Sequence, residues 1–136
     1  MRYLLDTDIC IYLIKNHPPE VLAQFRKHPP EDVAISAITL FELQYGAQKS
    51  RSARQSEKAL AKFLLPLSII ELDRFGAEEA AAIRAHLEKK GEPIGPYDLL
   101  IAGIARSRQM TLVTNNTKEF EKIDNLHLEN WVQATD

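Results

Sequence analysis

Cysteine is almost absent from this chain: Cys10 is the only one among 136 residues. A single thiol excludes an intramolecular disulfide and a zinc site built from several cysteines. Because Cys10 lies in the apolar segment DICIYLI, we expect a buried thiol with a packing role. A chain of this kind fits a reducing compartment, and we predict the cytoplasm.

Long hydrophobic runs and an excess of positive charge are also missing. No apolar stretch is long enough to cross a bilayer, and no basic segment with an apolar core and a cleavage site opens the chain, so we predict no contact with a membrane. With 17 Lys and Arg against 19 Asp and Glu, the formal net charge is -2. Binding to nucleic acid must therefore depend on a local site or a bound metal.

The rest of the composition is that of an ordinary globular protein. Hydrophobic residues make up 45% of the chain and charged residues 26%. A chain of 136 residues can bury a core of its own, and it contains no repeat, low-complexity tract or linker. We therefore predict a single domain over residues 1–136.

Short apolar segments alternate with helical segments along the chain. The predicted strands lie at 3–5, 33–36, 67–72, 111–114 and, as a small edge strand, 126–130. The predicted helices run from residue 7 or 8 to 15 and over 18–28, 37–48, 56–65, 74–90, 96–108 and 116–123. This order predicts an α/β fold, with a mostly parallel central sheet of four or five strands that is covered by helices on both faces.

Three acidic residues do not belong to an evident polar face. Asp6 directly follows the first predicted strand, Glu42 lies in a helix that is apolar nearly all round, and Asp98 lies in the apolar helix PYDLLIAGIARSR. Each has an ordinary explanation, which is N-capping for Asp6, a position at the rim for Glu42 and the helix dipole for Asp98. Unpaired burial would instead force such a carboxylate to protonate.

The predicted sheet brings these acids toward one edge. In open α/β sheets, ligands bind beyond the carboxyl ends of the strands, where Asp6 and the segment TLVTNNTKEF lie. Three carboxylates in one cleft repel each other unless a cation is present. Ligation by oxygen alone favours Mg²⁺ or Mn²⁺, and such a site is suited to hydrolysis of phosphate esters.

Four segments, in this order and spacing, resemble the PIN-domain ribonucleases and in particular the VapC-type toxins of type II toxin–antitoxin systems. They are YLLDTDICIYLIK, ISAITLFELQYGAQKS, GEPIGPYDLLIAGIARSR and TLVTNNTKEFEKIDNLHLENW. The resemblance covers about Tyr3 to Trp131 and implies a PIN-like three-layer α/β/α domain. It also implies that Asp6, Glu42 and Asp98 are the catalytic acids, with Asp6 and Asp98 as direct metal ligands.

The segment after the fourth strand both matches the family and departs from it. Thr114 matches the threonine of the family, whereas Asn116 stands where many members carry a fourth acid. Asn116 is then a neutral ligand, or Glu119 supplies the charge from the next helical turn. Asp8 stands where an asparagine is common, and we assign it to capping or to support of the ligands.

The resemblance implies Mg²⁺-dependent cleavage of structured RNA by an activated water, typically in a tRNA anticodon stem-loop. It implies a homodimer and a VapB-type antitoxin whose C-terminal segment blocks the acidic site, and it allows a larger assembly with that antitoxin. The candidate RNA contacts are Lys49, Arg51 and Arg54, with Arg106 and Arg108 as further basic residues. For each of these, an ordinary solvated surface is an equal alternative.

Two other interpretations are open. A phosphatase of the haloacid-dehalogenase type would also have an Asp-x-Asp pair after its first strand, as in LLDTD, but needs a late acidic pair where this chain has asparagines. A non-catalytic receiver-like regulatory domain would need a phosphate-accepting aspartate, for which Asp73 is available, and a lysine at the end of a later strand, which is missing.

Overall fold

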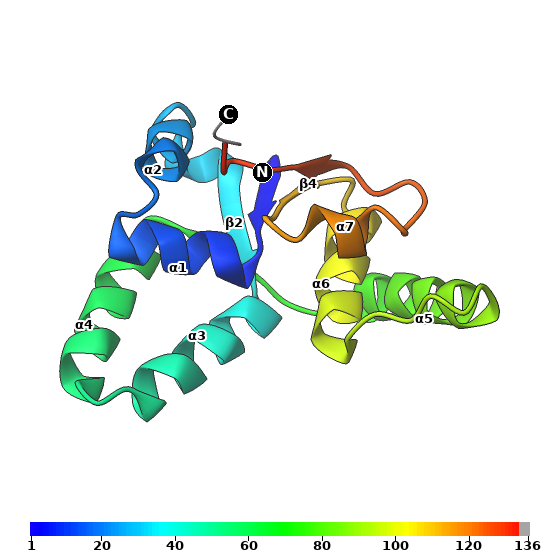
Figure 1. Cartoon of the computed structure of the whole chain (residues 1–136), viewed down its shortest axis with the longest axis horizontal. Helices are drawn as coiled ribbons and strands as arrows, with labels where there is room; N and C mark the ends of the chain where they lie inside the picture. Colours follow the sequence, from blue (N-terminus) through cyan, green and yellow to red (C-terminus); the bar gives the residue numbers. More distant parts are fainter. Residues whose placement is uncertain (134–136) are drawn as a thin grey trace.

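A five-stranded sheet forms the centre of the computed structural model, which describes residues 1–133 (Figure 1). Its strands are β1 (Tyr3–Leu5), β2 (Val33–Ser36), β3 (Ser68–Ile70), β4 (Thr111–Val113) and β5 (Leu128–Glu129). The order is β3-β2-β1-β4-β5, and all four neighbouring pairs are parallel. The end of the predicted single domain, residues 134–136, lies outside the described residues.

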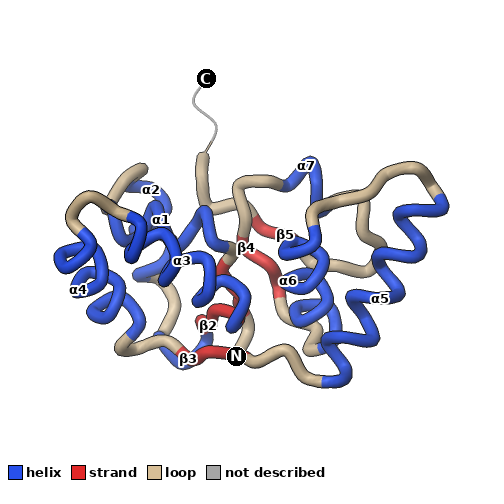
Figure 2. Tube along the Cα trace, turned by 90° about the horizontal axis from the view of Figure 1, so that it is seen from below, coloured by secondary structure: helices blue, strands red, loops and turns tan. Residues whose placement is uncertain are grey.

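The helices divide between the two faces of the sheet. They are α1 (Thr7–Lys15), α2 (Pro19–Arg26), α3 (Ala37–Lys49), α4 (Ala53–Leu64), α5 (Arg74–Lys89), α6 (Pro96–Ser107) and α7 (Thr117–Phe120), with a short 3₁₀ helix at Pro30–Asp32. Figure 2 shows α1 to α4 on one side of the strands and α5 and α6 on the other. This confirms the predicted α/β/α layers and parallel sheet.

Strand residues alternate between two hydrophobic cores, as the two-residue period of a strand requires. Leu5 and Ile35 pack with α1 to α4. Leu4 and Ala34 point the other way and pack with α5 and α6. All four side chains are fully buried, which explains why the strands have no polar alternation. Cys10 is buried in the first core, as expected.

Close contact between α5 and α6 sets the position of the helix that carries Asp98. A Cβ atom on Gly103 would lie 2.6 Å from the backbone oxygen of Gly76 and 2.7 Å from Cβ of Ala80. Only glycine therefore allows α6 to approach α5 this closely. Residues Ile101 to Ala105 are almost fully buried, which confirms that this helix lies deep in the protein.

Some helices differ from the prediction. Helix α2 covers Pro19–Arg26 where 18–28 was predicted, and α7 covers Thr117–Phe120 where 116–123 was predicted. Helix α4 begins at Ala53, three residues before the predicted start, so that part of the polar segment KSRSARQ is helical. Helix α3 has no clean polar face in the sequence, yet it buries only Thr39, Leu43 and Ala47. Its other side lies at the surface of the chain and exposes aromatic side chains. Among residues 1–133, no helix combines the length and the apolar character needed to cross a bilayer.

Candidate active site

Asp6 and Thr114 meet at the carboxyl ends of two neighbouring strands. Strands β1 and β4 are parallel and in register, with Leu5 opposite Val113, so the residue after each strand reaches the same edge of the sheet. The Thr114 hydroxyl donates a hydrogen bond of 2.8 Å to Asp6 Oδ2. Thr114 is fully buried, and Asp6 is only 6% exposed.

The two carboxylate oxygens of Asp6 have different partners. Its Oδ1 accepts a 2.8 Å hydrogen bond from the backbone N–H of Thr7 and so caps α1, while Oδ2 faces Thr114. Burial, followed by the nearby charge of Asp8, raises the pKa of Asp6 to about 6, against the opposing hydrogen bonds from Thr114 and Thr7. Capping therefore orients a carboxylate that remains costly to ionise without a cation.

Glu42 is joined to the same edge by Thr7, which sequence reasoning missed. Thr7 Oγ1 donates a 2.7 Å hydrogen bond to Glu42 Oε1 and lies 3.2 Å from Thr39 Oγ1. Glu42 is half-buried, and its charge raises the pKa values of both Asp6 and Asp98. The only sequence signal for Thr7 was its place between two aspartates.

The carboxyl group of Asp98 lies beside that of Glu119, which belongs to the first turn of α7. Burial, then the hydrogen bond to Glu119, raises the pKa of Asp98 to about 7. Burial opposes the charged form of Glu119 too, but hydrogen bonds from Asp98, Asn116 and Gly95 lower the pKa of Glu119 overall. These opposite shifts favour a proton on Asp98 over one on Glu119.

Asn116 points its side chain at Glu119. Its Nδ2 donates a 2.9 Å hydrogen bond to Glu119 Oε2, while Gly95 N donates one of 3.2 Å to Oε1. Asn116 is thus an orienting group for a neighbouring acid in this structure. Of the two sequence-based alternatives, this arrangement agrees with Glu119 as the source of the charge.

Asp8 connects α1 to the turn after β4. Its Oδ1 accepts a 2.7 Å hydrogen bond from Ile9 N, and its Oδ2 accepts one of 3.0 Å from Asn115 N. Burial raises the pKa of Asp8, against the opposing hydrogen bonds from Asn115 and Ile9. Asp8 therefore holds the turn that carries Thr114 and Asn116. The sequence places Asn115 at this strand end, but it did not predict this contact with Asp8.

The basic residues do not lie among the acids. Lys49, Arg51 and Arg54 are exposed at the end of α3 and the start of α4. Arg106 lies near the other end of α6 from Asp98, where it forms a 2.6 Å ion pair with Glu79. Arg108 follows α6, with its Nη2 3.9 Å from Asp73 Oδ2. The last two arginines are therefore less suited to contact a ligand at the acidic edge.

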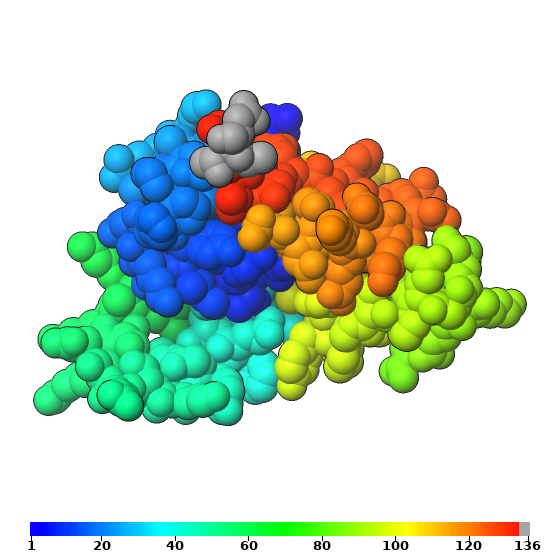
Figure 3. Space-filling view, viewed as in Figure 1, coloured from blue at the N-terminus to red at the C-terminus, as the bar shows by residue number. Residues whose placement is uncertain are grey.

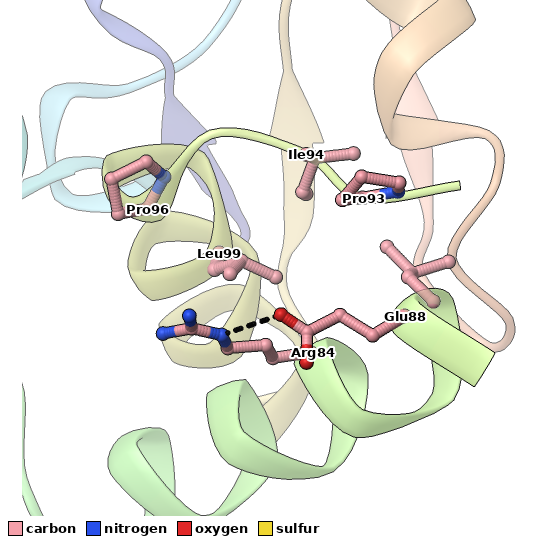
Figure 4. Close-up of a pocket in the computed structure, with 7 residues that line it drawn as sticks. Arg84, Glu88, Pro93, Ile94, Pro96 and Leu99 are labelled. Atoms are coloured by element: carbon pink, nitrogen blue, oxygen red, sulfur yellow. Dashed lines mark hydrogen bonds and ion pairs between the residues drawn. The ribbon is translucent and has the colours of Figure 1, made fainter. Parts of the chain in front are cut away.

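Two concave regions border this part of the molecule. One cavity of about 240 Å³ lies between α5, α6 and the segment before α6; Figure 4 shows Arg84 and Glu88, paired at 3.0 Å, below Leu99. It contains none of the clustered acids. The other, of about 490 Å³, is a groove between α1, α3 and α4 that is lined by Glu42 together with Ile11 and Leu60. Of these two regions, the groove is the one that reaches the acidic edge.

The donor set fits a hard divalent cation that retains water. Within the described residues, no three His, Cys, Asp or Glu side chains are gathered closely enough to enclose a metal ion by themselves. Asp6 and Asp98 are nevertheless both carboxyl groups with raised pKa values beside further carboxylates. Mg²⁺ is commonly bound by one or two protein carboxylates and several waters, which suits this pair.

A parallel sheet of this order with acids gathered at its carboxyl edge defines a class of protein. The family model for the PIN domain matches residues 3–126. The chain therefore belongs to the PIN-domain family, which confirms the resemblance found in its four segments.

Comparison with curated relatives gives the branch of the family. The chain is 40% identical over 131 residues to the tRNA(fMet)-specific endonuclease VapC of Shigella flexneri, which covers 96% of this chain and 98% of that protein. It is 45% identical over 137 aligned positions to Ribonuclease VapC2 of Rickettsia felis, with the same two coverages. These relatives place the chain in the VapC branch.

Solved structures agree with this placement. VapBC2 from Rickettsia felis, bound to a DNA fragment from the promoter, matches with 43% identity and a TM-score of 0.90, over 97% of this chain and 100% of that chain. DNA-bound VapBC from Salmonella typhimurium matches with 40% identity and a TM-score of 0.92, over 97% and 99%. The match to the PIN-domain family sets aside the phosphatase and receiver interpretations, and Asp73 serves as the N-cap of α5.

Proposed function

We propose that this chain is the endoribonuclease toxin of a VapBC-type toxin–antitoxin pair and that it hydrolyses RNA phosphodiester bonds at the acidic edge. The observation that carries the proposal is the convergence of Asp6, Glu42, Asp98 and Glu119, from four separate elements, at the carboxyl ends of β1 and β4. The relatives named above as ribonucleases match almost the whole chain.

Asp6 and Asp98 are the proposed ligands of a divalent cation, which we take to be Mg²⁺ with Mn²⁺ as an alternative. When bound, such an ion lowers the pKa of a water ligand and stabilises negative charge on the phosphate. Thr114 orients Asp6 Oδ2 for this purpose. The carboxylate of Glu119 lies beside Asp98 and keeps the carboxyl group of Asp98 directed to the site.

Glu42 completes the acidic cluster as a group that positions water. Thr7 holds Glu42 Oε1 at 2.7 Å and leaves Oε2 without a hydrogen bond to the protein in the described residues. A carboxylate oxygen in this state can accept a hydrogen bond from a water molecule beside the proposed cation. Glu42 is therefore assigned to orienting that water.

The proposed substrate is a structured RNA, and specifically a tRNA. The relatives from Shigella flexneri and Salmonella typhimurium are named tRNA(fMet)-specific endonucleases, and each is 40% identical to this chain. A chain of net charge -2 needs local cations to hold such a polyanion. Lys49, Arg51 and Arg54 are the proposed contacts, and a tRNA substrate implies action in the cytoplasm.

The proposed partner is a VapB-type antitoxin, because the structural neighbours include VapBC complexes. The groove between α1, α3 and α4 reaches Glu42 and has an apolar lining from Ile11, Leu43 and Leu60. It could therefore seat a segment that also covers the acids. We further propose a homodimer, which sedimentation equilibrium of the purified chain tests directly.

The function is tested by expressing the wild type, Asp6→Asn and Asp98→Asn, each with and without the antitoxin, and mapping RNA 5′ ends in the cells. Glu78→Gln is the matched control, because Glu78 is an exposed acid on α5 whose side chain is 62% exposed. We expect new RNA ends for the wild type and the control and none for the other two variants. A wild type that leaves the RNA ends unchanged refutes the proposed function, while active Asp6→Asn and Asp98→Asn variants refute the site.

A further inference from the structure

Two exposed aromatic side chains directly precede the acids of the site. Phe41 lies before Glu42 on α3, and Tyr97 lies before Asp98 on α6. Their ring centroids are 5.6 Å apart in an edge-on arrangement, although 52% of Phe41 and 47% of Tyr97 is exposed. Figure 3 shows the turquoise atoms of α3 beside the yellow atoms of α6 on the surface. The aromatic pair thus joins the two helices at the acidic edge.

The aromatic surface continues along α3. Residues 41, 45 and 49 are four positions apart and share one stripe of the helix. Tyr45 is 58% exposed, and Lys49 Nζ lies 5.4 Å from the centroid of its ring. We call Tyr97, Phe41, Tyr45 and Lys49 the aromatic strip. Its part on α3 is about 12 Å long, at 1.5 Å per residue.

We propose that the aromatic strip is a stacking surface for unpaired bases of the RNA substrate, next to the bond that is cleaved. This inference rests on the proposed ribonuclease function. Proteins that recognise unpaired RNA stack its bases on exposed Tyr and Phe rings, which accept any base because every base has a π face. The strip begins at Glu42 and Asp98, so bases held on it lie beside the acidic edge.

Charge favours RNA over a second copy of the chain as the ligand. The strip ends at Lys49, and the exposed Arg51 and Arg54 follow within five residues. These cations attract a phosphate backbone. An interface between protein copies is instead depleted of charged residues at its centre, whereas this strip includes Lys49 and is flanked by Glu42 and Asp98.

The test compares three leucine variants that keep apolar bulk but lack a π face, Phe41→Leu, Tyr45→Leu and Tyr97→Leu. Phe75→Leu is the matched control: Phe75 is 61% exposed, and the guanidinium of Arg74 lies 5.7 Å from its ring centroid. Phe75 therefore reproduces the pairing of an aromatic ring with a cation at a different place. It lies at the N-terminal end of α5 and lines a hollow with Ser107, which is at the opposite end of α6 from Tyr97.

Binding is measured in the full chain carrying Asp98→Asn, so that the RNA stays intact. The probe is the anticodon stem-loop of tRNA(fMet) with 2-aminopurine in its loop, whose fluorescence is quenched by stacking. Each leucine variant of the strip is expected to weaken binding by roughly 5- to 150-fold, the equivalent of one lost base–aromatic contact, and to reduce the quenching. In the cleavage-competent chain, KM should rise by a similar factor, while Phe75→Leu changes neither value.

Two outcomes overturn the proposal. In one, the strip variants bind the probe as tightly as Phe75→Leu. In the other, sedimentation shows that they convert a dimer to a monomer that still binds the RNA with wild-type affinity, which would make the strip an interface between copies. If the wild type does not cleave RNA, the proposed function is refuted. The binding assay still tests the aromatic strip in that case, because it does not depend on cleavage.

Discussion

Replacing Asp6 with asparagine should stabilise the metal-free protein at neutral pH while abolishing its activity. The pKa of Asp6 is raised from 3.8 to about 6 by burial and by the charge of Asp8. Between these pKa values the folded state binds more protons than the unfolded state, so the free energy of unfolding falls as the pH rises through this window. Above about pH 6, the carboxylate is ionised in both states, and its burial lowers the free energy of unfolding by the whole amount that corresponds to the pKa shift.

The magnitude follows from the shift. About two pKa units at 1.36 kcal/mol each correspond to about 3 kcal/mol. The substituted asparagine would keep an oxygen to accept the N–H of Thr7, but the Thr114 hydroxyl would lose its charged acceptor, at a cost of about 1 kcal/mol. Asp6→Asn should therefore raise the free energy of unfolding by about 2 kcal/mol above about pH 7, and slightly lower it below about pH 4.

Urea unfolding in EDTA at a series of pH values measures this directly. Adding Mg²⁺ at 100 times its Kd should then stabilise the wild type by about 2.7 kcal/mol and leave Asp6→Asn nearly unchanged. The gain in the free energy of unfolding of Asp6→Asn over the wild type isolates the contribution of Asp6 and should grow between about pH 4 and pH 6. A difference that does not vary with pH would refute the reasoning.

Three further changes test other parts of the structure. Thr7→Val removes the hydroxyl that holds Glu42 at 2.7 Å, so kcat should fall by about 10-fold or more in an RNA cleavage assay while the circular dichroism spectrum is retained; unchanged kcat would contradict the orienting role. Glu119→Gln removes the ionised partner of Asp98, and calorimetric titration should show Mg²⁺ affinity reduced by roughly 10- to 100-fold; equal affinity would exclude Glu119 from the site. Gly103→Ala places a Cβ 2.6 Å from a backbone oxygen, and thermal unfolding should show a loss of about 1–3 kcal/mol. Gly46→Ala on α3, where a Cβ meets nothing within 4 Å, is its control and should gain about 0.5–1 kcal/mol; equal effects of the two would refute the packing argument.

Much of the fold could be predicted from local patterns. The strands at 3–5 and 33–36 and the helix that begins after Asp6 agree with the structure residue by residue or nearly so. Short apolar runs identify strands and a helical period identifies helices. Both patterns depend on residues that are close together in the chain, so they can be recognised in the sequence. The start of α4 was placed three residues too late, because the polar segment KSRSARQ carries no apolar stripe to mark it as helical.

The candidate site could be predicted only in part. Sequence reasoning named Asp6, Glu42 and Asp98 because carboxylates in apolar surroundings are unusual in any fold. It assigned no role in the site to Thr7 or Asn115, since a threonine or an asparagine is ordinary at the surface, in a turn or at a helix end. Their roles depend on hydrogen bonds to Glu42 and Asp8, which are 35 and 107 residues away along the chain.

The sequence by itself therefore determined the elements, the α/β class and the unusual acids. Only the tertiary structure decided how Asn116 orients Glu119 toward Asp98, and that one side of α3 exposes Phe41 and Tyr45 instead of burying them. The physical reason is the range of the interactions. Helix and strand formation depends on residues a few positions apart, whereas a contact between two acids or an exposed ring depends on which distant segments the sheet brings together, or leaves apart, at its carboxyl edge.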